Sequence, residues 1–175
     1  RPYIPDRGFY KDGPRNNGET FTGYWKGVDE VYKSAYNDPH AYYTNGSFTP
    51  ESEASARFNE GEKAGADLIN QLNEGKIKLK DGETIKIVGH SQGAAYAAGI
   101  ATALTNSKYG SLIEFVDYIS PHQPGDFTHP SKVKGRQFST ENDRVSSDAG
   151  PLGWLINLVN GGSDLEKIKG ISDTI

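Results

Sequence analysis

The stretch that decides the fold of this 175-residue chain is residues 84–104, TIKIVGHSQGAAYAAGIATAL. Its opening, TIKIV, is short, rich in β-branched side chains and followed by glycine, which is typical of a buried strand. From Ala94 onward the stretch is rich in alanine, the residue that favours a helix most strongly. GHSQG joins the two parts, so the sequence predicts a strand, a tight turn at Ser91 and a helix in direct succession.

Glycines stand two positions before and two positions after Ser91. In a nucleophile elbow this pattern holds a serine on a strained strand-to-helix turn, where glycines relieve the crowding. A serine hydroxyl is a poor nucleophile unless a base takes its proton and N–H groups stabilise the oxyanion. We therefore predict Ser91 as the nucleophile and the backbone N–H of Gln92 as an oxyanion donor. The alternative is a turn whose glycines serve packing only.

Further elements are predicted on both sides of this stretch. They are a helix over about 21–36, a short strand over 41–44, a helix over 49–72, and strands over 113–119 and 136–139. Gly61 and Gly65 lie on the apolar face of the second helix, and we expect them to pack closely against a sheet. Strands that alternate with helices predict an α/β fold with a mostly parallel central sheet and helices on both faces. We expect one domain over 1–175, with an irregular lead-in over 1–20.

Composition excludes several classes of site. Cysteine is absent, which rules out disulfides, thiolate metal sites and a cysteine nucleophile. The net charge is −4, and no cluster of Lys and Arg suggests a nucleic-acid partner. No metal-ligand or phosphate-loop spacing is visible, so we expect neither metal nor cofactor. No signal or membrane-spanning run is present, and the chain opens on Arg1, so we expect a piece of a longer protein.

Three segments carry a family resemblance. Residues 84–104 resemble the nucleophile region of class 3 lipases and related α/β-hydrolases, and residues 115–121 resemble the strand that follows it. FSTENDRV, residues 138–145, resembles the strand end that carries the acid of that family. The resemblance implies an α/β-hydrolase fold and hydrolysis of a lipid or another ester, as in lipases, phospholipases and esterases. It also implies that Asp143 orients the catalytic histidine.

The chain, with HQPGDF at residues 122–127, is also similar to lipase-like toxin domains. Those domains end large bacterial secreted repeat proteins of the Rhs-like kind. This similarity implies an antibacterial effector that is secreted or delivered to a target cell. It also implies an immunity or inhibitor protein as partner and only transient contact with a membrane surface.

The histidine of the family's order Ser…Asp…His is missing, because no histidine follows Asp143. Three explanations are open. The base lies beyond Ile175, in which case the sheet also lacks its last strand; or His122 or His129 serves as the base; or the site is inactive or uses another arrangement. The alternative function is a catalytically incomplete module that acts by binding a partner or an inhibitor.

The remaining histidines and acids are weaker candidates. We expect His90 to be packed, since neighbouring side chains diverge at an elbow, and His40 to lie on the surface. Asp117 and Asp126 are the alternatives to Asp143 as the acid, although Asp117 stands in mid-strand, where a structural role is expected. No signature marks a second oxyanion donor. The elbow is shared with acyltransferases and thioesterases, so the acyl acceptor also stays open.

Overall fold

The structure, a computed structural model, describes residues 8–11, 15–16, 19–20, 25, 27–46, 53–139, 166–171 and 173–174. The chain divides into two compact units, Arg1–Phe48 and Thr49–Ile175. Whether they form one domain stays a prediction, and each unit is described by itself.

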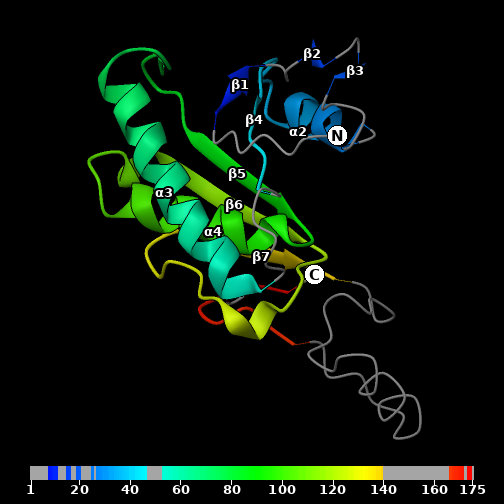
Figure 1. Cartoon of the computed structure of the whole chain (residues 1–175). Coiled ribbons are helices and arrows are strands. Elements are labelled where there is room, and N and C mark those ends of the chain that lie inside the picture. The colour runs from blue at the N-terminus through cyan, green and yellow to red at the C-terminus, as the bar shows by residue number, and fades with distance from the viewer. Residues whose placement is uncertain are drawn as a thin grey trace, which may run out of the picture. The chain divides into compact units, whose positions relative to one another are not determined.

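The described residues of the first unit form short strands and helical segments (Figure 1). Strand β1 (Tyr10–Lys11) pairs antiparallel with β4 (Tyr42–Tyr43), and β2 (Arg15–Asn16) pairs antiparallel with β3 (Glu19–Thr20). The expected irregular lead-in thus contains ordered pairs of residues. Helix α2 (Val28–Ala35) covers the second half of the helix predicted over about 21–36. Trp25 is helical too, whereas residues 21–24 and 26 lie outside the described residues. Between Trp25 and α2, Gly27 has a φ of 89°, a left-handed conformation that glycine adopts readily.

The second unit is built on a parallel sheet, as predicted. Its strands lie in the order β5 (Ile85–His90), β6 (Ile113–Ile119), β7 (Gly135–Phe138) and β8 (Asp173–Thr174), and every neighbouring pair is parallel. Helices α3 (Ala54–Asn73) and α4 (Gly93–Thr105) accompany it, with short 3-10 turns at η1 (Gly110–Leu112) and η2 (Pro124–Asp126). A mixed α/β fold with a parallel sheet and helices is therefore confirmed.

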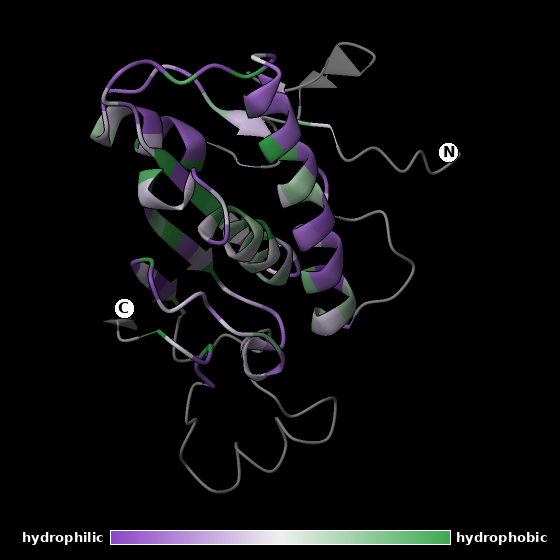
Figure 2. Cartoon of the chain, turned by 90° about the vertical axis from the view of Figure 1, so that its left-hand side faces the viewer, coloured by the Kyte–Doolittle hydropathy of each residue, from purple (hydrophilic) through white to green (hydrophobic). Residues whose placement is uncertain are grey.

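Helix α4 is the centre of the core and lies between the sheet and α3 (Figure 2). Toward the sheet it packs against Gly89 of β5, where a Cβ would lie 2.7 Å from the Cβ of Ala97. Toward α3 it presents Gly99, where a Cβ would collide with the carbonyl oxygen of Phe58. The alanine and glycine content of α4 allows both close contacts, since small side chains let neighbouring backbones approach.

Gly61 and Gly65 do not pack against the sheet, and that prediction is wrong. A Cβ at Gly61 would collide with the carbonyl of Tyr96, and one at Gly65 would lie 2.6 Å from the Cβ of Ala103, both in α4. Helices α3 and α4, the long helices of the described part of the second unit, therefore cover one face of the sheet in two layers. Helices on its other face stay a prediction.

Residues 166–171 join the sheet through the buried side chain of Gln137. Its Nε2 donates to the carbonyl of Glu166 at 3.0 Å, and its Oε1 accepts from the N–H of Ile168 at 2.9 Å. These bonds bring the chain back to β7 and set the start of β8. Among the described residues, no helix combines the length and the apolar character that crossing a bilayer requires.

Candidate active site

The candidate site lies at the carboxyl ends of β5, β6 and β7, which point the same way in Figure 1. Ser91 follows the last residue of β5 and has a φ of 54°, in the left-handed region that non-glycine residues seldom adopt. Its N–H donates to the carbonyl of Ile119 at 3.0 Å. Its carbonyl accepts from the N–H groups of Ala94 at 3.0 Å and His122 at 3.2 Å. The predicted sharp turn is therefore present, and Ser91 itself is half-buried.

The two glycines of the motif differ in what they do. A Cβ at Gly89 would lie 2.6 Å from the carbonyl oxygen of Gly93 and 2.9 Å from the Cα of Ala94, so this position has no room for a side chain. A Cβ at Gly93 would meet no described atom within 4 Å, and the φ of Gly93 is not positive. The prediction that glycine relieves crowding is confirmed for Gly89. It is wrong for Gly93, because the space beside Gly93 is open.

Gln92 stands at the N-terminal end of α4, with φ −60° and ψ −25°. Among the hydrogen bonds between backbone groups of the described residues, none has the Gln92 N–H as donor. A free N–H at a helix N-terminus, where the helix dipole adds positive potential, can stabilise an anion. The Gln92 side chain is held separately, because its Oε1 accepts from Nη2 of Arg57 at 3.2 Å.

Backbone strain gathers at this edge of the sheet. Ser120, after β6, has a φ of 44°, and Gln123 before η2 has a φ of 50°. Of the non-glycine residues with positive φ in the described part of the chain, only Asn37 lies elsewhere. Such conformations persist only where the surroundings enforce them, and they concentrate at functional sites. The residue types Ser and Gln gave no signal of this strain.

The described histidines differ in their availability as a base. His122 is half-buried, and its N–H contacts the Ser91 carbonyl, so its backbone adjoins the turn. His40 is exposed in the first unit, as expected, and His90 is half-buried at the end of β5. The side chain of His90 points to the sheet face opposite to that of Gly89, because successive strand residues alternate.

His129 is occupied inside the core. It is only 2 % exposed, its Nδ1 lies 2.8 Å from the Tyr118 hydroxyl, and its Nε2 lies 2.8 Å from the carbonyl oxygen of Val133. A carbonyl oxygen only accepts, so Nε2 carries the proton and Nδ1 accepts from Tyr118. Burial lowers the pKa of His129, against a smaller opposite effect of the Val133 hydrogen bond. With both ring nitrogens bound, His129 serves packing and is no longer a candidate base.

Neither Asp117 nor Asp126 has the surroundings expected of the acid that orients a catalytic histidine. Asp117 is fully buried, and its two oxygens accept from Nε and Nη2 of Arg136 at 2.7 Å each. The guanidinium of Arg136 also lies 4.4 Å from the ring centroid of Phe115. Asp117 thus has the expected structural role, and Asp126 is exposed in η2. Asp143 lies outside the described residues, so its role stays a prediction.

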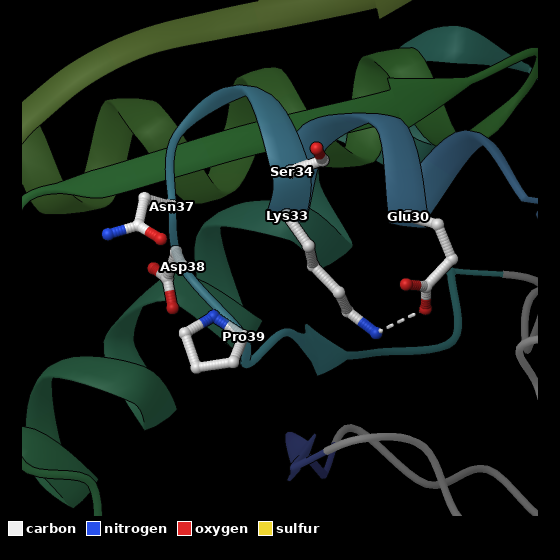
Figure 3. A pocket seen from close by; sticks show the side chains of 6 residues that line it. All are labelled: Glu30, Lys33, Ser34, Asn37, Asp38 and Pro39. Atoms are coloured by element: carbon white, nitrogen blue, oxygen red, sulfur yellow. Dashed lines mark hydrogen bonds and ion pairs between the residues drawn. The ribbon is translucent and has the colours of Figure 1, made fainter.

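A surface depression in the first unit offers no comparable chemistry. Figure 3 shows its lining side chains, which are Glu30, Lys33, Ser34, Asn37, Asp38 and Pro39. Nζ of Lys33 lies 3.0 Å from Oε1 of Glu30 and 3.8 Å from a carboxylate oxygen of Asp29, so its charge is compensated by the neighbouring turn. Among the described residues, no group of three or more His, Asp or Glu side chains is placed to hold a metal ion.

The arrangement at the sheet edge places the Ser91 residue, the Gln92 N–H and the N-terminus of α4 next to one another. Sequence reasoning identified Ser91, Gln92 and His122, whereas it missed Arg57, Ser120 and Gln123. Arg57 could have been noticed because it stands three residues after Ala54 and four before Gly61, on the apolar face of α3. No protein-family model, no curated protein and no solved structure matches this chain.

Proposed function

We propose that this chain is a serine hydrolase of carboxylic esters, of the α/β-hydrolase type, with Ser91 as its nucleophile. The single observation behind the proposal is the left-handed backbone of Ser91 between a parallel strand and a helix. Glycine would hold this conformation without steric cost, whereas a non-glycine residue there costs about 1–3 kcal/mol. Serine has a strained Cβ there, and its hydroxyl is the one functional group that it offers in return, which favours a chemical role for the hydroxyl.

In the proposed reaction the Ser91 oxygen attacks the ester carbonyl carbon while a base accepts the hydroxyl proton. The carbonyl oxygen becomes an oxyanion that accepts a hydrogen bond from the Gln92 N–H. The protonated base then gives its proton to the leaving alcohol oxygen, and an acyl-enzyme remains. Water attacks the acyl carbon with the same base as proton acceptor, which releases the acid and restores Ser91.

The base is a histidine, held by Asp143 in the arrangement that the lipase resemblance implies. It is supplied either by chain beyond Ile175 or by His122, whose backbone adjoins Ser91. The substrate class of lipids, including phospholipids, rests on the resemblance, and so do delivery to a target cell, an antibacterial role and an inhibitor protein as partner.

A binding module without catalysis is the second candidate function. It is favoured by one observation: both ring nitrogens of the buried His129 are bound, to Tyr118 and to Val133, so this histidine does not serve as the base. In that case the strained edge of the sheet would be a contact surface for a partner or inhibitor.

A fluorophosphonate probe separates the two functions, since it reacts with activated serines. We expect one phosphonyl group on the wild-type chain and on Ser111→Ala, a matched control at an exposed serine in η1. Ser91→Ala should take up none. Absence of labelling in the protein at its full natural length, or labelling that persists in its Ser91→Ala variant, would favour the binding module.

A further inference from the structure

A charged side chain of α3 lies buried beside the candidate site. Arg57 is 5 % exposed, although arginine is rarely buried without a specific partner. Nη2 of its guanidinium donates to Oε1 of Gln92 at 3.2 Å. Gln92 directly follows Ser91, so the contact links α3 to the turn that carries the proposed nucleophile.

The position of Arg57 is fixed by contacts on both sides of it along α3. Oε1 of Gln123, in the loop after β6, accepts from the N–H of Ala54 at 3.0 Å. Further along α3, Gly61 packs directly against Gly99 of α4. Arg57 lies between these two attachments, so the packing of α3 fixes where its side chain begins. Because the side chain is also buried, its guanidinium is held at the sheet edge.

We propose that Arg57 is a positioning residue, which acts through the Gln92 side chain to hold the Gln92 backbone N–H toward the developing oxyanion. This inference rests on the proposed function, since it needs Gln92 as the oxyanion donor. Donors aimed in advance stabilise a transition state because the protein does not have to reorganise during the reaction. Because the guanidinium of Arg57 is charged, its hydrogen bond to the Gln92 side chain restrains Gln92 more strongly than a hydrogen bond from a neutral donor would.

Phosphonylation of Ser91 measures this role, because the reaction also develops negative charge on oxygen. The variants are Arg57→Ala, Arg57→Lys, Gln92→Ala, which retains the backbone N–H, and the double variant Arg57→Ala/Gln92→Ala. The matched control is Lys63→Ala, at an exposed residue of the same helix. Each rate constant is compared with the thermal midpoint of the same variant.

We expect Arg57→Ala and Gln92→Ala each to slow phosphonylation about tenfold, a fraction of the loss caused by removing an oxyanion donor altogether. The double variant should be no slower than the slower single variant, because both changes break one contact. Arg57→Lys should recover part of the rate, and Lys63→Ala should match the wild type. Nitrogen-15 relaxation should show a more mobile Gln92 amide in Arg57→Lys, which is a readout independent of the reaction.

Each failure has its own signature. If the wild-type protein at its full natural length does not react, the proposed function falls and this inference with it. If the wild type reacts and both Gln92→Ala and Arg57→Lys react as fast as the wild type, Ser91 remains the nucleophile and the positioning role is overturned. Losses that multiply in the double variant would also overturn it, since Arg57 would then act independently of Gln92. Gln92→Ala retains the α3 packing, so the test holds even if Arg57→Ala does not fold.

Discussion

The N–H of Ser91 donates to the carbonyl oxygen of Ile119 at 3.0 Å. This bond continues the parallel pairing of β5 with β6 by one residue beyond His90, the last residue of β5. The strained turn is thus held by the neighbouring strand as well as by the helix that follows. A backbone conformation enforced from two sides fixes the direction in which the Ser91 side chain leaves the turn.

The strain at Ser91 is measurable as a stability difference. Ser91→Gly should be about 1 kcal/mol more stable than Ser91→Ala, because both lack the hydroxyl and only glycine fits the left-handed backbone without strain. Urea unfolding of the two variants gives the difference. If Ser91→Gly is no more stable than Ser91→Ala, the turn is relaxed and the argument from strain fails.

The two motif glycines should respond differently to alanine. Gly89→Ala should lose about 2 kcal/mol or more, since its Cβ would press against the backbone of α4. Gly93→Ala should be neutral or slightly stabilising, because its Cβ meets open space and alanine favours the helix. Thermal midpoints of the pair test this. Equal losses in both variants would show that Gly93 is crowded after all.

Acid should weaken the fold through His129. Its folded-state pKa lies below the unfolded value because of burial, so between those two values the unfolded chain binds more protons. The stabilising contribution is therefore fully present above the ordinary histidine pKa of about 6.5 and is lost as pH falls below it. The free energy of unfolding, measured from pH 7.5 to 5, should fall less in His129→Gln than in the wild type. His40→Asn, at an exposed histidine, is the matched control for the loss of a histidine.

Asp117 should matter for stability and not for chemistry. Asp117→Asn should cost roughly 3 kcal/mol, because it leaves the Arg136 guanidinium without its fully buried carboxylate. The phosphonylation rate per folded molecule should stay at the wild-type level, whereas Asp143→Asn should slow ester hydrolysis. A stable Asp117→Asn variant without activity would make Asp117 the acid and remove Asp143 from that role.

Local patterns predicted the elements that depend on local physics. Strand β6 has the predicted bounds, because its apolar, β-branched run is clearly delimited by neighbouring turns. Strand β5, the turn at Ser91 and α4 follow one another as the sequence around GHSQG requires. Gly61 and Gly65 predicted a close approach correctly, but a row of small residues does not reveal whether a sheet or a helix approaches.

Features that depend on tertiary contacts escaped the sequence. Ser120 and Gln123 have residue types that do not require a left-handed backbone, so their conformations follow from the surrounding loops. Helical spacing places Arg57 on the apolar face of α3, but its contact with Gln92 is recognisable only once α3 is known to lie on α4. His129 was a candidate base because its partners, Tyr118 and Val133, are recognisable only once the strand and the loop are placed together.

Peptide mapping of the phosphonylated chain tests the central claim most directly, since it identifies the residue that carries the phosphonyl group. The account predicts that the added mass is found on Ser91 and on no other residue of the mapped peptides. A modification on any other serine, with Ser91 unmodified, would contradict it.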